Sequence, residues 1–310
     1  MAPHLLEKIH PDCRNFVTVI DELLRRRQSE LAQGDYHQIH FAEEWGPRTW
    51  SQTEMEDIVY SSYKQMRRGR ITRPPKRTVV MEISDYLNCS MSERNRLLEA
   101  AQFAPIDIYI TGERLIDLLQ PTITVAQALS CPAMVINRDW HIHFVNEQML
   151  NLHSVQPDTL KSIPTDHFNA LRMLIDPDLP LYMSLIDNKP SWTRMVRQTI
   201  YGFKLANRLC QFENWYQDLI RDWMTLPEFE YHWKTVRIDE PFEDDFSAKN
   251  MPSAVLLNTA IPSIENRRFW LRPLIISTGY FQFDFPQIVA FLPADEEAQN
   301  TLTQIGALAV

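Results

Sequence analysis

A close series of helix-start signals between residues 51 and 101 constrains the fold of this chain more than any other feature of its sequence. Ser51 and Glu54 have the spacing of a capping box, in which each side chain satisfies a backbone amide at the start of a helix. Apolar residues at helical spacing follow this signal and three others, which are Ser61 with Ser62, Thr78, and Ser90. Gly69 and the prolines at 74–75 separate the segments. Because helices this short are unstable alone, we expect them to pack on one another.

A longer helical pattern precedes this series. Apolar residues recur there at intervals of three and four, at Phe16, Val17, Ile20, Leu23 and Leu24. Three arginines follow at 25–27, and cations in a last helical turn suit the negative end of the helix dipole. Residues 34–49 are polar and aromatic with glycine and proline breakers, so they indicate a loop or short hairpin. We therefore expect an all-α domain of five short helices in residues 1–105.

Strand patterns appear only after residue 105, where six of the eight tryptophans lie. Residues 133–136 and 141–145 predict two short strands around a tight polar turn. Helical patterns follow at 147–152, from Pro190 onward and at 212–224, with further strands expected at 229–238, 253–260, 268–277 and 280–292. This order is typical of an α+β domain with helices on one face of an antiparallel sheet, and we assign it residues 106–310.

The net charge of −9 is distributed unevenly along the chain. Residues 1–105 carry 15 basic and 15 acidic side chains, whereas residues 106–310 carry 16 basic and 25 acidic ones. Seven lysines and arginines lie within residues 58–81, and no acidic residue does. A basic segment on an otherwise acidic protein concentrates attraction for phosphate on one face. The alternative is a solvated basic loop without a partner.

Several classes of protein are disfavoured by composition. No run of 18 apolar residues predicts a membrane span, and the N-terminus does not resemble a signal peptide. The four cysteines are far apart and form no CxxC pair, so we expect reduced thiols and a cytoplasmic protein. With seven glycines and no phosphate-binding glycine motif, the chain gives no sign of a nucleotide cofactor, and we expect none.

Several short motifs in order resemble the MmyB-like bacterial regulators, in which an Xre-type helix-turn-helix precedes a PAS-like ligand-binding domain. In the first domain they are Trp50-Ser51-Gln52 with Met55, Met66-Arg67-Arg68-Gly69-Arg70, and Leu97-Leu98 with Ala100-Ala101. In the second they are 132–136 through Asn146, Ile175-Asp176-Pro177, Trp192, Pro227-Glu228-Phe229 with Trp233, and Phe291-Leu292-Pro293. The resemblance implies a transcriptional regulator that binds double-stranded DNA as a homodimer, and no enzyme.

The chain departs from the family pattern in three places. The 17 steps from Gln52 to Gly69 are about three fewer than is usual in the family, so the turn is shortened. Arg67 stands where the family usually has an acidic residue. The segment between the first and second helices is longer than usual. These departures leave the helix-turn-helix interpretation in place.

The resemblance identifies residues for DNA contact. A recognition helix presents short polar or amide side chains to base edges, and neighbouring cations hold phosphates. The base-facing candidates are Ser61, Ser62, Tyr63, Lys64 and Gln65, and the phosphate-binding candidates are Arg68, Arg70 and Arg73. The alternative is a basic helix that serves only solubility.

The second domain is rich in aromatic and apolar residues, and the resemblance implies that part of them lines a pocket. A small apolar ligand with one polar end, such as a fatty acid, would suit it. The candidate residues are Phe144, Tyr182, Trp192 and Met195, with Arg194, Arg197 or Arg272 for a carboxylate. Three alternatives remain: a filled core that serves only dimerisation, an enzyme fused to a DNA-binding arm, and a metal site at His141, His143, Glu147 and His153.

Overall fold

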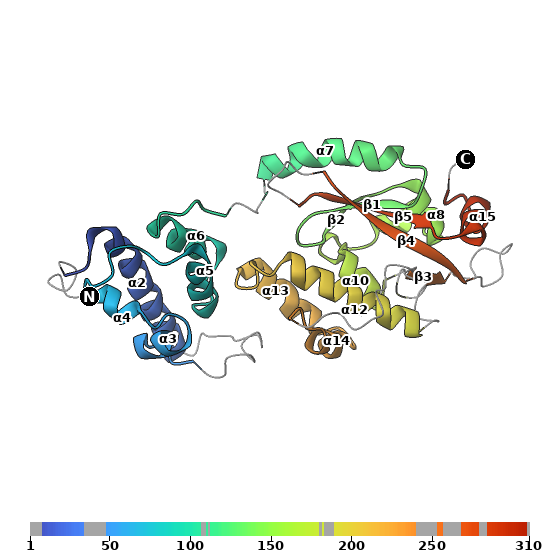
Figure 1. The fold of residues 1–310 in the computed structure, drawn as a ribbon. Coiled ribbons are helices and arrows are strands. Elements are labelled where there is room, and N and C mark those ends of the chain that lie inside the picture. The colour runs from blue at the N-terminus through green and yellow to red at the C-terminus, as the bar shows by residue number, and fades with distance from the viewer. Residues whose placement is uncertain are drawn as a thin grey trace. The chain divides into compact units, whose positions relative to one another are not determined.

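The computed structural model describes residues 8–33, 48–106, 110, 112–179, 182, 189–239, 253–256, 268–278 and 284–308. Contacts divide the chain into two compact units. The first unit comprises residues 1–107 with 209–221, and the second comprises 108–208 with 222–310. The chain is a mixed α+β protein in which helices come first and an antiparallel sheet with helices follows (Figure 1).

Five helices of the first unit lie between residues 11 and 100. They are α2 (Pro11–Gln33), α3 (Gln52–Ile58), α4 (Tyr63–Arg67), α5 (Arg77–Tyr86) and α6 (Met91–Ala100). Phe16, Ile20, Trp50 and Leu97 are among the fully buried side chains that join them in one core. The expected five helices are therefore present. The predicted loop or hairpin at 34–49 lies mostly outside the described residues.

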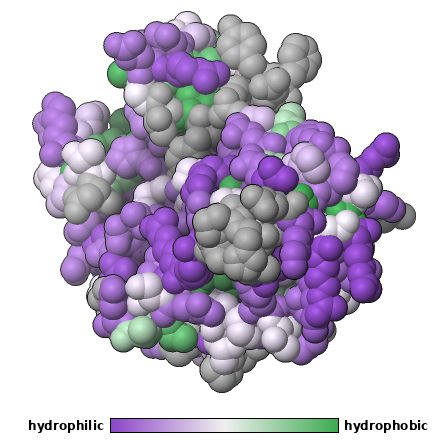
Figure 2. Space-filling view, turned by 90° about the vertical axis from the view of Figure 1, so that its left-hand side faces the viewer, coloured by the Kyte–Doolittle hydropathy of each residue, from purple (hydrophilic) through white to green (hydrophobic). Residues whose placement is uncertain are grey.

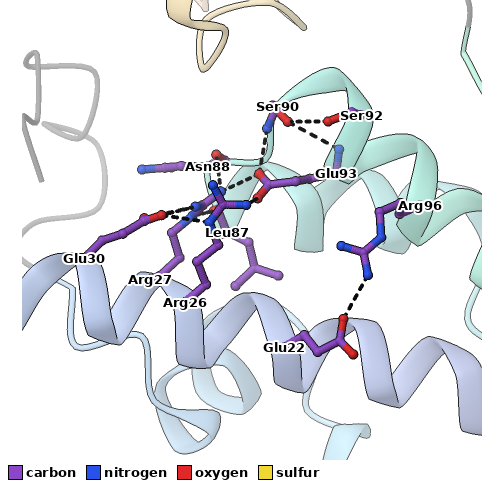
Figure 3. Close-up of polar contacts among 10 residues, drawn as sticks. All are labelled: Glu22, Arg26, Arg27, Glu30, Leu87, Asn88, Ser90, Ser92, Glu93 and Arg96. Carbon is purple, nitrogen blue, oxygen red and sulfur yellow. Dashed lines mark hydrogen bonds and ion pairs between the residues drawn. The ribbon is translucent and has the colours of Figure 1, made fainter.

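Two local expectations for this unit were wrong. Helix α2 extends to Gln33, so the arginines at 25–27 lie within it rather than in its last turn. Side-chain pairing explains the continuation, because Arg26 and Arg27 both form ion pairs with Glu30 and Glu93 (Figure 3). Helix α5 begins at Arg77 after Lys76, so Thr78 does not cap it.

The buried Arg27–Glu93 pair joins α2 to the start of α6 at 2.5 Å. Burial alone would lower the pKa of the Arg27 guanidinium, but the Glu93 and Glu30 carboxylates raise it above its ordinary value. Glu93 also completes a capping box with Ser90, so the same carboxylate fixes a helix start and an interhelical contact (Figure 3).

Most of the remaining helices and strands belong to the second unit. They are α7 (Gly112–Ala128), β1 (Ala133–Ile136), β2 (Ile142–Val145), α8 (Glu147–Leu152), α9 (Pro157–Lys161), the 3₁₀ helix η1 (Thr165–His167), α10 (Ala170–Ile175), α12 (Lys189–Ala206), α13 (Asn214–Trp223), α14 (Phe229–Thr235), β3 (Ser253–Leu256), β4 (Arg268–Ser277), β5 (Gln287–Pro293) and α15 (Glu296–Gln304). Most of α13 is assigned to the first unit. Among the described residues, no helix combines the length and apolar character needed to cross a membrane.

The five strands form one sheet in the order β2-β1-β5-β4-β3, and every neighbouring pair is antiparallel. Leu119 and Ala126 of α7 pack on one face, against Val135 of β1 and Ile288 of β5. Helix α10 packs near the other face, where Ala170 and Met173 share a buried cluster with Ile136 and Ile142. In Figure 1, α7 and α10 accordingly lie on opposite sides of the sheet, so the expectation of helices on one face only was wrong.

The predicted strand at 229–238 is instead helix α14. Its buried residues are Phe229, His232 and Trp233, spaced three and four apart as on one helical face. Their aromatic side chains suggested a strand because aromatic residues are common in both strands and buried helices. The strand at 268–277 is confirmed as β4. β3 covers Ser253–Leu256, and the rest of the strand predicted at 253–260 lies outside the described residues. β5 begins at Gln287, so residues 284–286 of the strand predicted at 280–292 do not belong to it.

Candidate nucleic-acid interface

The buried carboxylate of Asp21 in α2 forms hydrogen bonds with both α3 and α4. Asp21 of α2 is only 5% exposed. Its Oδ1 accepts hydrogen bonds from the Tyr63 hydroxyl of α4 at 2.8 Å and from Gln52 Nε2 of α3 at 3.0 Å. Burial and the nearby Asp21 carboxylate raise the pKa of the Tyr63 hydroxyl well above its ordinary value, so Tyr63 stays a hydrogen-bond donor. Asp21 thus sets the positions of both short helices.

Arg67 completes the same network. Its guanidinium lies 3.7 Å from Asp21 Oδ2 and also donates to Gln52 Oε1. The unusual base at position 67 therefore has an acidic partner on the neighbouring helix. Arg67 belongs to the framework that holds α4, and it is set back from the more exposed side chains of that helix.

Gly69 ends the segment after α4 in a conformation that favours glycine, with φ of +73°. A Cβ atom at this position would lie 2.0 Å from the Lys8 carbonyl oxygen. Position 69 therefore requires glycine both for its backbone conformation and for this close approach, which places Lys8 beside the end of α4.

Six of the eight predicted DNA-contacting residues are exposed, and all six lie between residues 61 and 73. Ser61, Lys64, Gln65, Arg68, Arg70 and Arg73 are exposed, and we call them the α4 surface. Ser62 is half-buried at the N-cap of α4. Tyr63 is fully buried, so it is part of the core and not of this surface. The reason is the helical period, which turns Tyr63 and Met66 inward together.

The cations of the first unit differ in their partners, and Arg14 and Arg25 donate to backbone carbonyls. Arg26, Arg27, Arg67, Arg94 and Arg96 all form ion pairs. Within the part of the chain that the structure describes, no hydrogen bond or ion pair engages the side chains of Lys8, Lys64, Arg68, Arg70, Arg73, Lys76 or Arg77. The unpaired positive charge is thus concentrated around the end of α4, where it is available to an anionic partner.

Acidic residues near this surface are found on α3. The Glu54 carboxylate accepts hydrogen bonds from the Thr49 amide and hydroxyl. Burial alone would raise the pKa of Glu54, but these hydrogen bonds lower it below its ordinary value. Asp57 is exposed.

Figure 2 views the side of the molecule on which α2, α3 and α4 lie in Figure 1, and hydrophilic residues predominate on it.

The predicted ligand-binding residues of the second unit do not meet in one place. Phe144 packs with the α7 cluster, whereas Trp192 is buried and contacts Tyr182 and His232 edge to face. The Trp192 indole donates to the Leu174 carbonyl at 2.7 Å. The other candidates lie on α12 or β4: Met195 and Arg197 are half-buried, and Arg194 and Arg272 are exposed.

The predicted histidine cluster also separates. His141 and His143 lie 4.9 Å apart between ring centroids, while His153 caps the end of α8 and Glu147 begins that helix. Among the described residues, no group of three or more His, Cys, Asp or Glu side chains is arranged to hold a metal ion.

Sequence reasoning missed the role of Asp21. The available signal was an acid within an apolar helical stripe, because Asp21 is four residues after Val17 and three before Leu24. Its partners could not be identified, since they lie on helices more than thirty positions away.

No model of a known protein family matches the chain, and no curated protein matches it.

Proposed function

We propose that the chain is a sequence-specific regulator of transcription that binds double-stranded DNA through the α4 surface. The observation that carries this proposal is the segregation of charge. The arginines that hold the first unit together are paired, whereas those at the end of α4 carry no partner among the described residues. Such cations attract phosphates, and amide and hydroxyl groups beside them can form hydrogen bonds with base edges. Gln65 and Ser61 supply these groups on the same surface.

The arrangement of α3 and α4 supports a helix-turn-helix. Four residues separate the end of α3 from the start of α4, and both helices rest on α2 through Asp21. In such a motif the second helix enters the major groove with its N-terminal side chains toward the bases. Lys64 and Gln65 stand near the start of α4, with Arg68 and Arg70 beyond its end. A helix of five residues presents few side chains, so a homodimer reading two half-sites would supply the missing specificity.

We propose that the second unit receives a small apolar ligand and that its occupancy alters the affinity for DNA. The five-stranded antiparallel sheet with helices on both faces supports this role, since it provides an apolar interior on either side. Ligand binding can change DNA affinity only if the ligand prefers one state of the protein, and the coupling is then reciprocal.

The test of DNA binding uses the full chain and a pool of random duplexes. Affinity should fall steeply with salt, because bound phosphates release counterions. The double variant Arg68→Ala/Arg70→Ala should bind all duplexes more weakly, and the slope of affinity against salt should fall by roughly two. Arg96→Ala is the matched control, since Arg96 is exposed but paired with Glu22. Equal effects of both variants, or binding that ignores salt, would refute the proposal.

A further inference from the structure

The segment before α2 lies against the chain that follows α4. A Cβ atom at position 69 would lie 2.0 Å from the Lys8 carbonyl oxygen and 3.2 Å from the Lys8 carbonyl carbon. Near the start of α2, the Cys13 thiol donates to the Ile71 carbonyl oxygen at 3.6 Å, although 58 positions separate these two residues in the sequence. The two segments are therefore in contact at two points along their length.

Burial of the neighbouring residue holds Lys8 at this place. Ile9 is only 2% exposed and belongs to the core of the first unit, against which Ile71 also packs. The Ile9 carbonyl oxygen accepts a hydrogen bond from the Arg14 guanidinium at 3.4 Å. Lys8 itself is exposed. Its side chain therefore starts from a backbone position that is fixed by Ile9 on one side and by Gly69 on the other.

Lys8 thereby joins two other cations that are distant from it in the sequence. Arg68 and Arg70 flank Gly69, so the Cα atom of each lies about 3.8 Å from that of Gly69. All three cations are exposed, and none forms a hydrogen bond or ion pair in the described part of the chain. Salt screens charges over about 8–10 Å. Three side chains that start this close together can therefore act on the same partner.

The fold brings these like charges together without an internal partner for them. No acidic residue occurs within 58–81 to offset their repulsion. Arg67 shows the contrast, since its guanidinium lies 3.7 Å from the Asp21 carboxylate. The contact with Lys8 also restricts position 69 to glycine. A strand of DNA presents one phosphate per about 3.4 Å of helix axis, so it can engage several neighbouring cations at once.

We propose that the Lys8 ammonium group holds a phosphate of the duplex beside those held by Arg68 and Arg70. The segment before α2 is then part of the DNA interface. This inference rests on the proposed function and adds to it a residue from outside the basic segment at 58–81. The role belongs to the ammonium group, because the contact with position 69 is made by the Lys8 backbone. A phosphate contact of this kind strengthens binding to every sequence alike.

The experiment measures the affinity of the full chain for one selected duplex at a series of salt concentrations. Lys8→Gln removes the charge and keeps the backbone contact. Loss of one phosphate contact should lower the slope of log affinity against log salt by about 0.9. Between about 50 and 200 mM salt, the wild-type chain should accordingly lose about 3.5-fold more affinity than Lys8→Gln. Single-base variants of the duplex should all show the same change.

Two control variants separate this contact from a general effect of charge. Lys8→Arg keeps the charge and should keep the wild-type slope. Arg96→Gln removes one positive charge from an exposed arginine that is paired with Glu22, and it should also keep the slope. Thermal unfolding should be the same for Lys8→Gln and the wild-type chain, because the Lys8 side chain is exposed and has no partner among the described residues.

Ethylation of single phosphates in the duplex locates the contact, because an ethylated phosphate loses its charge. Lys8→Gln should remove the sensitivity of binding at one phosphate. Arg70→Ala should remove it at the same phosphate or at a neighbour on the same strand, since both residues are next to Gly69. Two sensitive phosphates that lie more than about 10 Å apart along the helix axis would overturn the shared site.

The outcomes for Lys8 can be told apart from those for DNA binding as such. An unchanged slope for Lys8→Gln, or an equal loss in Lys8→Arg or Arg96→Gln, overturns the role of Lys8. If Arg68→Ala/Arg70→Ala still lowers the slope in that case, DNA binding through the α4 surface stands. If the wild-type chain binds no duplex, the proposed function and the role of Lys8 are both wrong.

Discussion

The hydroxyl of Tyr63 donates a 2.8 Å hydrogen bond to Asp21 Oδ1, although 42 positions separate the two residues in the sequence. Both side chains are buried, so this hydrogen bond replaces those that the two groups would otherwise form with water. The bond places the start of α4 on the middle of α2. Since Gln52 and Arg67 share the same carboxylate, the geometry of the α4 surface depends on one residue that is not part of it.

Replacing Asp21 with alanine should therefore destabilise the first unit by roughly 2–4 kcal/mol, because the buried Tyr63 hydroxyl and the Arg67 guanidinium lose their partner. Denaturant unfolding monitored by circular dichroism measures this. The adjacent Glu22→Ala is the control, since the Glu22–Arg96 pair is about half exposed and should contribute less than about 1 kcal/mol. Similar losses in both variants would contradict the role of Asp21.

Two glycines with positive φ allow conformational strain to be separated from steric contact. Alanine at Gly69 or at Gly112 should cost about 1–2 kcal/mol of backbone strain. Gly69→Ala should cost more and should weaken DNA binding, because its Cβ would meet the Lys8 carbonyl. Among the described residues, no atom lies within 4 Å of a Cβ at Gly112. Thermal unfolding of the two variants gives the comparison, and an equal loss would show that the close contact is unimportant.

The α4 surface should divide into residues that read bases and residues that hold phosphate. Gln65→Ala should relax sequence preference at one position of the site by roughly 1–3 kcal/mol, because an amide pairs with adenine through two hydrogen bonds. Arg70→Ala should weaken binding to every sequence equally. Affinities for a set of single-base variants of a selected site distinguish these results. A uniform loss for Gln65→Ala would assign that side chain to the backbone instead.

Stability should fall in mild acid in a way that depends on His153. Burial lowers the pKa of His153 from 6.5 to about 4 in the folded protein. Between these pH values the unfolded chain binds the proton and the folded chain does not, so stability is lost as pH falls from about 6.5 to 4. His153→Gln should flatten this part of the profile, measured by unfolding at a series of pH values. An unchanged slope would mean that other groups account for it.

The proposed homodimer should be detectable in solution. Light scattering at micromolar concentration should give twice the chain mass of 36.5 kDa, with or without an operator duplex. The preferred duplex should contain two half-sites about one helical turn apart. A monomer under both conditions would show that one α4 surface suffices for binding.

The positions of helices could be inferred where a capping residue and apolar residues at helical spacing indicate the same start. The starts of α3 and α6 follow from Ser51 and Ser90, whose side chains accept the expected backbone hydrogen bonds. The end of α2 could not be inferred, because Arg27 is stabilised by Glu93, which lies 66 positions away. Helix α14 was mistaken for a strand because the aromatic residues of 229–238 fit both periods in so short a segment.

The basic residues of the α4 surface stood out in the sequence because no acidic residue lies within 58–81, whereas Ser61 and Gln65 were identified through the family resemblance. The inward position of Tyr63 could not be identified, because polar aromatic side chains suit both a core and an interface. The unequal coverage of the two faces of the sheet was beyond sequence reasoning for a different reason. Val135 and Met134 differ in exposure because α7 covers one face of the sheet more completely than α10 covers the other. The residue types at 134 and 135 do not indicate which face a helix will cover.

The five residues of α4 form too short a helix to persist outside the folded unit. A peptide copied from this segment should therefore fail to compete for DNA, however well its side chains match the site. In the whole protein, recognition should disappear at the temperature at which the first unit melts and not before. Under the proposed function, a damaged or partly unfolded copy would therefore be unable to occupy an operator.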